Sequence, residues 1–96
     1  MSLLFSIVTL NYYNPTVDTN LYKKAYFLSR RGLNELDQIL IPFVENKFLD
    51  LKIQDKSSFL SLLENEDVDL LEWILYGKTV PKQYLDILNK IVSNNK

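Results

Sequence analysis

From residue 18 to the C-terminal end, apolar residues recur at the three-and-four spacing of amphipathic α-helices. Polar breaks, glycines and prolines divide this pattern into separate segments. We expect helices over residues 19–31, 33–51, 54–65, 68–76 and 81–93. No alternating strand pattern competes in this region. The sequence therefore predicts an all-α fold, a compact bundle of about five short helices.

Several of the predicted helices carry signals for their ends. Arg30 and Arg31 fall in the last turn of the first helix, where the helix dipole favours cations. Gly32 suits the C′ position just beyond that turn. Further along the chain, Asp67 is the expected N-cap of the fourth helix and Gly77 its expected stop. These residues set the boundaries of the predicted bundle.

Two prolines refine the prediction. Pro42 lies inside the second helix, where its missing N–H leaves the Gln38 carbonyl without a partner and predicts a bend. Pro81 suits the first turn of the fifth helix. The apolar faces of the first and fifth helices are expected to face the core, and their members are Leu21, Tyr22, Ala25, Tyr26, Phe27 and Leu28, and Tyr84, Leu85, Leu88, Ile91 and Val92.

The N-terminal residues 1–17 form a separate region. Residues 3–10 are an apolar run that is shorter than the roughly 20 residues of a membrane-spanning helix. No Lys or Arg precedes the run and no small-residue cleavage pattern follows it, which argues against a signal peptide or a mitochondrial transit peptide. We expect residues 1–17 to be an extension before a helical domain over residues 18–96: an appended strand, a loosely ordered segment, or the result of a start codon placed upstream of the domain. A cytoplasmic location is preferred to the mitochondrial matrix.

Composition excludes several classes of function. The 96 residues, 47% of them apolar, fit one small domain. A formal charge of −1 gives no attraction for nucleic acid. The absence of Cys and His removes thiol and imidazole chemistry and the usual zinc ligands, and no calcium-loop spacing is present. Paired carboxylates need a cleft for acid–base catalysis, which so small a bundle rarely forms. We expect no metal site, no membrane insertion and no enzymatic activity.

The junction of the first two helices, residues 30–37, concentrates two arginines, a glycine and two carboxylates. In a docking interpretation, the planar guanidinium of Arg31 makes a bidentate contact to a partner, and Arg30 adds a second contact. Gly32 leaves room for the partner surface. Glu35 either accepts hydrogen bonds from the partner or holds Arg31 in position, and Asp37 lies at the edge of the patch.

A structural interpretation of the same residues is also open. Gly32 would only end the first helix, Glu35 would satisfy free amides at the start of the second, and both arginines would be solvated partners of the helix dipole. Trp73 has two interpretations as well: it is first a core anchor and second a partner contact. The acidic residues Glu64, Glu66, Asp67 and Asp69 are expected to cap and solvate the fourth helix, or else to face a basic patch on a partner.

Three segments together resemble a known family. They are RRGLNELD at residues 30–37, IPFVE at residues 41–45 and LLENEDVDLLEW at residues 62–73. In this order and spacing they are similar to the SdhE family of succinate dehydrogenase FAD assembly factors, over residues 21–92. The family's Arg-Gly-x-x-Glu motif is matched by Arg31, Gly32 and Glu35. The resemblance favours the docking interpretation of the junction.

The resemblance implies a small helical protein that binds the flavoprotein subunit of succinate dehydrogenase, or of fumarate reductase, and promotes covalent attachment of FAD to a histidine of that client. This chain has no histidine and no glycine-rich dinucleotide fingerprint, so we expect it to bind no FAD itself. We also expect a monomer when free. The alternatives are a helical adaptor or toxin-neutralising protein with another partner, and a direct FAD carrier.

Overall fold

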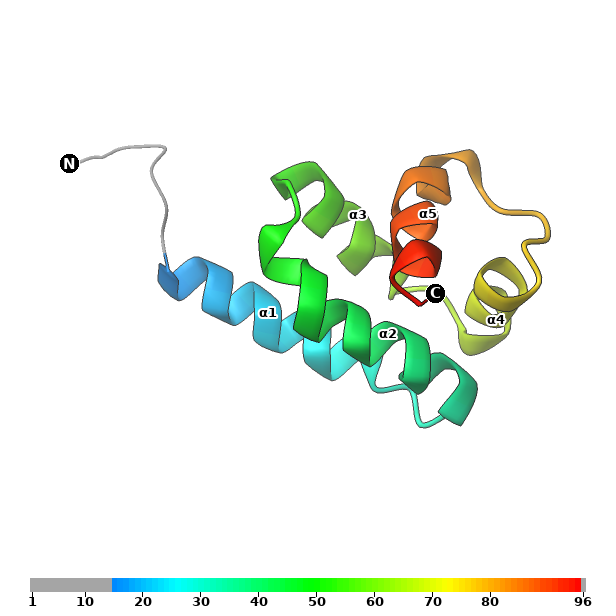
Figure 1. Cartoon of the computed structure of the whole chain (residues 1–96), viewed down its shortest axis with the longest axis horizontal. Coiled ribbons are helices and arrows are strands. Elements are labelled where there is room, and N and C mark those ends of the chain that lie inside the picture. The colour runs from blue at the N-terminus through cyan, green and yellow to red at the C-terminus, as the bar shows by residue number, and fades with distance from the viewer. Residues whose placement is uncertain (1–14, 96) are drawn as a thin grey trace.

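The computed structural model describes residues 15–95, and all regular structure in that range is helical. Figure 1 shows a bundle of short helices, as the hydrophobic pattern predicts. The elements are α1 (Pro15–Ser29), α2 (Asn34–Lys47), η1 (Phe48–Asp50), α3 (Ile53–Leu62), α4 (Asp67–Leu75), η2 (Lys82–Tyr84) and α5 (Leu85–Asn94), where η marks a single turn of 3₁₀-helix.

The helices pack around an antiparallel pair. α1 and α2 run back along each other, α3 and α5 lie to one side of this pair, and α4 lies at the end where α1 turns into α2 (Figure 1). This arrangement brings the start of α4 next to the link between the first two helices. Within residues 15–95, no helix is long and apolar enough to cross a membrane.

Three phenylalanines form the centre of the core. Phe59 of α3 lies between Phe43 of α2 and Phe48 of η1, with ring centroids 5.2 Å and 5.9 Å away, and all three side chains are buried. Burying one such side chain contributes about 1.5 to 3 kcal/mol. The aliphatic side chains that complete the core are mainly Leu36, Leu40, Val44, Leu62, Leu70, Ile87 and Ile91.

The end of α2 and the start of α5 differ from the sequence prediction. α2 continues through Pro42 but ends at Lys47, because the next three residues tighten into the 3₁₀ turn that buries Phe48. The fifth predicted helix likewise opens with a 3₁₀ turn after Pro81. The predicted core face of α5 is too wide, since Leu85 and Val92 are exposed.

α1 begins at Pro15, so the predicted start at residue 19 and the predicted domain boundary after residue 17 both fall inside it. Residues 1–14 of the predicted extension lie outside the described residues. Near its start, α1 is tied to α3. The ammonium group of the buried Lys56 lies 3.5 Å from the Asp18 carboxylate and 5.9 Å from the centroid of the Phe48 ring.

Candidate partner-binding site

The link between α1 and α2, residues 30–33, forms a sharp corner. The sequence pattern predicts that Arg30 and Arg31 lie in the last turn of the first helix. This is wrong, because α1 ends at Ser29 and both arginines lie beyond it. The Arg30 N–H still donates to the Phe27 carbonyl at 3.3 Å. Gly32 has φ +81°, a left-handed conformation that glycine adopts without strain. The conformational role predicted for Gly32 is confirmed, although it lies farther from the helix end than a C′ residue.

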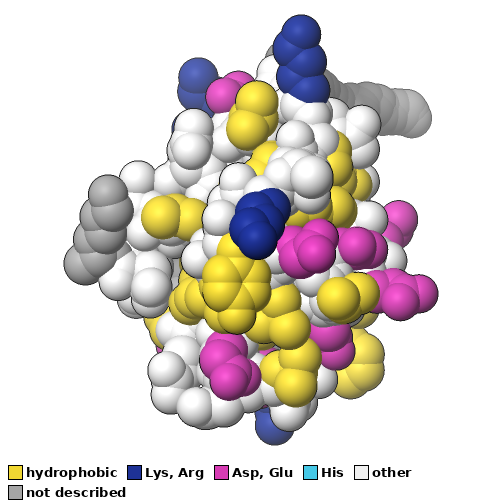
Figure 2. Space-filling view, turned by 90° about the vertical axis from the view of Figure 1, so that its right-hand side faces the viewer, with side chains coloured by type: hydrophobic (Ala, Val, Ile, Leu, Met, Phe, Trp, Pro, Cys, Tyr) yellow, Lys and Arg dark blue, Asp and Glu magenta, His cyan; other side chains and the backbone are white. Residues whose placement is uncertain are grey.

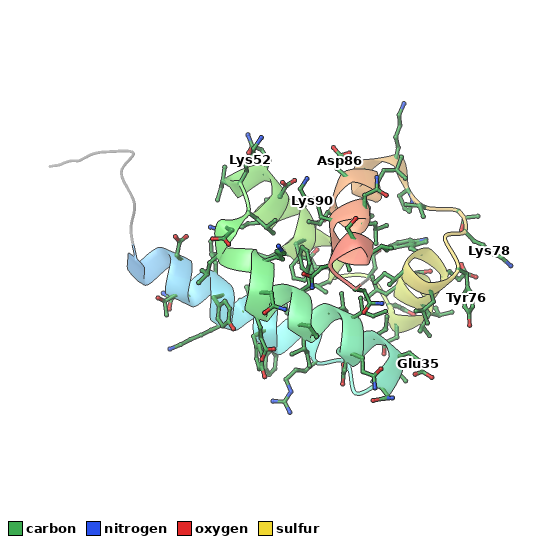
Figure 3. The ribbon with its side chains drawn as sticks, in the orientation of Figure 1. Glu35, Lys52, Tyr76, Lys78, Asp86 and Lys90 are labelled. Carbon is green, nitrogen blue, oxygen red and sulfur yellow. The ribbon has the colours of Figure 1, made fainter. Side chains whose placement is uncertain are left out.

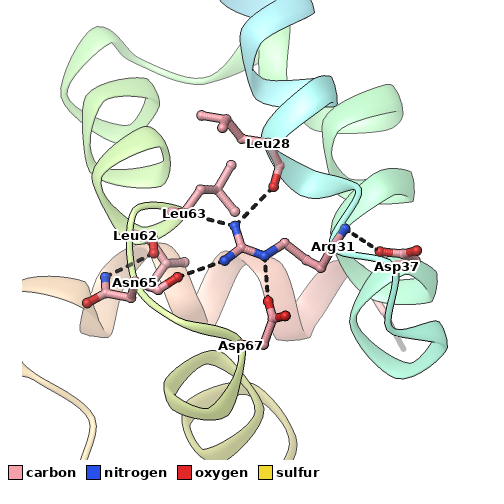
Figure 4. A network of polar contacts seen from close by, with 7 residues as sticks. All are labelled: Leu28, Arg31, Asp37, Leu62, Leu63, Asn65 and Asp67. Carbon is pink, nitrogen blue, oxygen red and sulfur yellow. Dashed lines mark hydrogen bonds and ion pairs between the residues drawn. The ribbon is translucent and has the colours of Figure 1, made fainter.

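Arg31 turns inward from this corner. Its guanidinium donates four hydrogen bonds to three other parts of the bundle, as Figure 4 shows. Only 14% of its side chain is exposed. The acceptors are Asp67 Oδ1 at 2.7 Å from Nε, the carbonyls of Leu28 and Leu63 at 3.1 Å and 2.8 Å from Nη1, and the carbonyl of Asn65 at 2.7 Å from Nη2.

These acceptors are groups that helix ends leave without partners. Leu28 lies in the last turn of α1, and Leu63 and Asn65 lie in the turn after α3, where carbonyls lack intrahelical N–H donors. Asp67 is the first residue of α4, a position that favours a carboxylate. Arg31 therefore fastens three helices together at one point. The predicted N-cap role of Asp67 is wrong: Glu66 is the N-cap, and the Asp67 side chain bonds to Arg31.

This network changes the role that the sequence suggested for Arg31. A guanidinium has five N–H groups, and four hydrogen bonds to the chain itself leave no free pair for a bidentate contact to a partner. Asp37 is also turned inward, since it accepts the Arg31 backbone N–H at 2.8 Å. Both residues shape the corner from within.

Arg30, Gly32 and Glu35 remain on the outside of the corner and are exposed. Among residues 18–95, whose side chains are described, the Glu35 carboxylate makes no hydrogen bond or ion pair, so it neither holds Arg31 nor caps α2. Figure 3 shows it at the start of α2, near the corner. A Cβ atom added to Gly32 would meet nothing within 4 Å. The space beside Gly32 is therefore open to another molecule.

The structure adds Phe27 to the corner. This side chain is 75% exposed, although the apolar pattern of α1 predicts that it faces the core. Phe27 is two residues from the buried Ala25, about 200° around the helix, and that spacing is the signal that would have placed it outside. It lines a shallow hollow of about 580 Å³ together with Leu28, Arg30, Arg31, Gly32, Asp37 and Asp67.

Trp73 lies elsewhere in the structure. Its ring packs against Tyr84, with centroids 5.7 Å apart, and the side chain is only partly buried against the core. It does not line the hollow at the corner. This position agrees with the core-anchor interpretation, and a contact with a partner stays a prediction.

Comparison with known proteins shows the family of this chain. A family model described as flavinator of succinate dehydrogenase matches residues 23–95, which contain the corner and every residue bonded to Arg31. The chain belongs to this family. The identification made from the three sequence segments is confirmed.

Individual relatives agree with the family match. A protein of Francisella tularensis named FAD assembly factor SdhE is 34% identical over 73 residues, which cover 76% of this chain and 77% of the relative. Proteins of the same name from Vibrio vulnificus and Pseudomonas aeruginosa are 39% identical over 67 residues and 43% identical over 53 residues. These matches cover 69% and 55% of this chain, and 78% and 63% of the relatives. No solved structure matches the chain.

Proposed function

We propose that the chain binds the flavoprotein subunit of succinate dehydrogenase and promotes the covalent attachment of FAD to it. The family match over residues 23–95 carries this proposal. The relatives are named for FAD assembly and not for a catalysed reaction. The exposed corner supplies a surface for such a partner. The family match and the named relatives favour this function over that of a helical adaptor with an unrelated partner.

We propose that residues exposed at the corner contact the flavoprotein and that an inward-facing residue positions them. Phe27, Arg30, Gly32 and Glu35 face outward and are the proposed contacts. Phe27 offers an apolar ring, Arg30 and Glu35 offer opposite charges, and Gly32 allows close approach. Arg31 is a positioning residue, because its hydrogen bonds hold the corner and the start of α4 in one arrangement.

The chemistry of flavin attachment belongs to the client in this proposal. The chain has no histidine that could accept the flavin and no glycine-rich loop for a dinucleotide phosphate. We therefore propose that it binds no FAD and catalyses no reaction by itself, that it acts as a monomer, and that it works in the bacterial cytoplasm. A fumarate reductase flavoprotein is a second client of the same kind.

The proposed mechanism is differential binding. A partner shifts the conformations of its client only by the difference between its affinities for them. If the chain binds the unmodified flavoprotein more tightly than the flavinylated one, attachment of FAD releases it without an energy source. Titration of both client forms tests this step, and equal affinities contradict it.

The deciding experiment measures covalent flavin in cells. A strain that lacks the gene is complemented with the natural chain, with Glu35→Lys or with the control Glu45→Lys, which changes an exposed glutamate of the same helix away from the corner. In-gel flavin fluorescence of the flavoprotein subunit is the readout. We expect the signal to return with the natural chain and the control and to stay low with Glu35→Lys. Full flavin attachment without the gene would refute the proposed function.

A further inference from the structure

The outward face of α4 carries apolar side chains that the bundle does not cover. Val68 is 59% exposed, Leu75 is 38% exposed, and Tyr76, which directly follows the helix, is 67% exposed. Leu71 is partly buried between them along the chain. We call these four residues the α4 stripe. It contains three of the eight large hydrophobic side chains that are exposed in residues 18–95, so the helix offers a second apolar surface.

Helix geometry explains why this surface faces outward. Leu70 and Ile74 point into the core and are buried. Val68, Leu71 and Leu75 follow the three-and-four spacing on another side of the same helix. Figure 2 looks at the side on which α4 and the following loop lie, and it shows hydrophobic side chains gathered into a patch with acidic side chains along one edge. α4 therefore has one apolar side in the core and another in solvent.

The α4 stripe begins at the corner. Asp67 lines the hollow beside Phe27 and Gly32, and Val68 is the next residue along α4. Because Arg31 holds Asp67 at 2.7 Å, the corner and the first turn of α4 are fixed relative to each other. A molecule that covers the corner is thus placed beside the stripe.

The size of a stable interface also calls for more surface than the corner gives. Specific protein–protein interfaces bury about 800 Å² on each partner and have an apolar centre. The corner offers one exposed large hydrophobic side chain, Phe27, among charged neighbours. The α4 stripe supplies the apolar area that the corner lacks.

Charge defines the chemistry of the partner. Glu66, Asp69 and Glu72 accompany the stripe on α4 or at its start, and Glu64 precedes them. Lys78 lies beyond Tyr76 at the other end of the helix (Figure 3). The fitting surface is therefore an apolar patch bordered by Lys or Arg side chains, since an acidic partner would be repelled along most of this face.

We propose that the α4 stripe and the corner form one continuous docking surface, and that the flavoprotein subunit covers the stripe with an apolar patch bordered by basic side chains. This inference rests on the proposed function, because it names the same client. It adds a second set of contacts that bind through apolar burial, while the corner contributes Phe27 and its charged and polar neighbours.

The test is a titration of the purified flavoprotein subunit without covalent FAD against variants of the full chain. Val68→Lys and Leu75→Lys place a charge in the stripe. Ile53→Lys is the matched control, because Ile53 is 65% exposed on α3. Lysine is a good helix former, so all three variants are expected to fold, and thermal unfolding checks this. We expect the stripe variants to weaken binding about tenfold or more and the control to leave it unchanged.

The possible outcomes separate this inference from the proposed function. Unchanged affinity of both stripe variants overturns the inference, and loss of binding by Gly32→Arg in the same series leaves the proposed function standing. A natural chain that fails to bind the flavoprotein overturns both. Sedimentation of the free chain tests a second copy as the occupant: a dimer that Val68→Lys dissociates would overturn the inference. Slower association of Asp69→Lys at low salt, together with weaker binding by the stripe variants, supports it.

Discussion

Arg31 and Asp67 are 36 positions apart in the sequence and are joined by a 2.7 Å hydrogen bond between Nε and Oδ1. The bond fastens the start of α4 to the end of α1. Because the rest of the guanidinium bonds to carbonyls of α1 and of the turn after α3, the arginine of the family motif builds the corner from inside. Its effect on partner binding is therefore inseparable from its effect on folding.

The first prediction concerns stability. Arg31→Ala removes the donors to three carbonyls and leaves Asp67 unpaired, so we expect the free energy of unfolding to fall by about 3 kcal/mol. Arg31→Lys recovers only part of this loss, because an ammonium group does not reproduce the planar fork. Urea denaturation followed by circular dichroism measures both changes.

Arg30→Ala is the control for that series. Arg30 is exposed, and surface substitutions of this kind change stability by less than about 0.5 kcal/mol. If Arg31→Ala were no more destabilising than Arg30→Ala, Arg31 would not hold the corner together.

The second prediction distinguishes two roles of Gly32: its left-handed backbone conformation and the open space that it leaves for a partner. Gly32 and Gly77 both have positive φ, +81° and +63°, and an added Cβ at either position meets nothing within 4 Å. Gly32→Ala, Gly32→Arg and Gly77→Ala should each lower stability by about 1 to 2 kcal/mol through strain alone. Only Gly32→Arg should also abolish binding of the flavoprotein, because its side chain fills the approach to the corner.

Thermal unfolding and titration of the three glycine variants give the two readouts. Retention of full affinity by Gly32→Arg would remove Gly32 from the docking surface. Equal loss of affinity in Gly77→Ala would instead assign the effect to lowered stability of the whole chain.

The third prediction tests the aromatic side chain at the corner. Phe27 is 75% exposed, so Phe27→Ala should leave the free energy of unfolding unchanged within about 0.5 kcal/mol. An exposed aromatic that becomes buried in an interface is a common energetic centre, and we expect binding to weaken about tenfold or more. Isothermal titration compares this variant with Leu49→Ala, which truncates another exposed hydrophobic residue on η1. Equal affinities for the two variants would contradict the assignment.

The elements of this fold could be predicted because they depend on local pattern. The apolar spacing gave five helices, and Gly77 follows α4 with positive φ, as expected for its stop. The role of Arg31 could not be predicted in the same way, since three of its four side-chain acceptors lie 32 to 36 positions away, in segments that only the packed bundle brings close to it. The prediction for Phe27 fails for a simpler reason: the apolar face predicted for α1 is wider than the part of the helix that the bundle buries, and Phe27 lies in the exposed part.

The fourth prediction uses the pH dependence of Tyr84. Its hydroxyl lies 3.1 Å from Ser61 Oγ and accepts a hydrogen bond from Asn65 Nδ2 at 3.3 Å. The Ser61 bond is the main cause that lowers the pKa of Tyr84 below its usual 10.0, while burial acts in the opposite direction. Between the folded and the unfolded pKa, the unfolded chain binds more protons than the folded chain, so stability rises with pH. This contribution is complete above 10.0 and is lost as the pH falls through the folded pKa.

Comparison with Tyr84→Phe isolates this effect. The difference in the free energy of unfolding between the natural chain and the variant should grow in favour of the natural chain as the pH rises from neutral towards 10.0, and it should level off above 10.0. A difference for Tyr84→Phe that does not change over this range would show that the Ser61 bond does not favour the phenolate.

α1 is held near both of its ends by a cation: Lys56 pairs with Asp18 near the start, and Arg31 bonds to Leu28 in the last turn. The proposed docking surface is thus preformed before any partner binds. Little conformational entropy is then lost on association, so little of the binding free energy is used to order the chain. The association rate is then limited by diffusion and orientation, and substitutions on the docking surface are expected to act mainly on the dissociation rate.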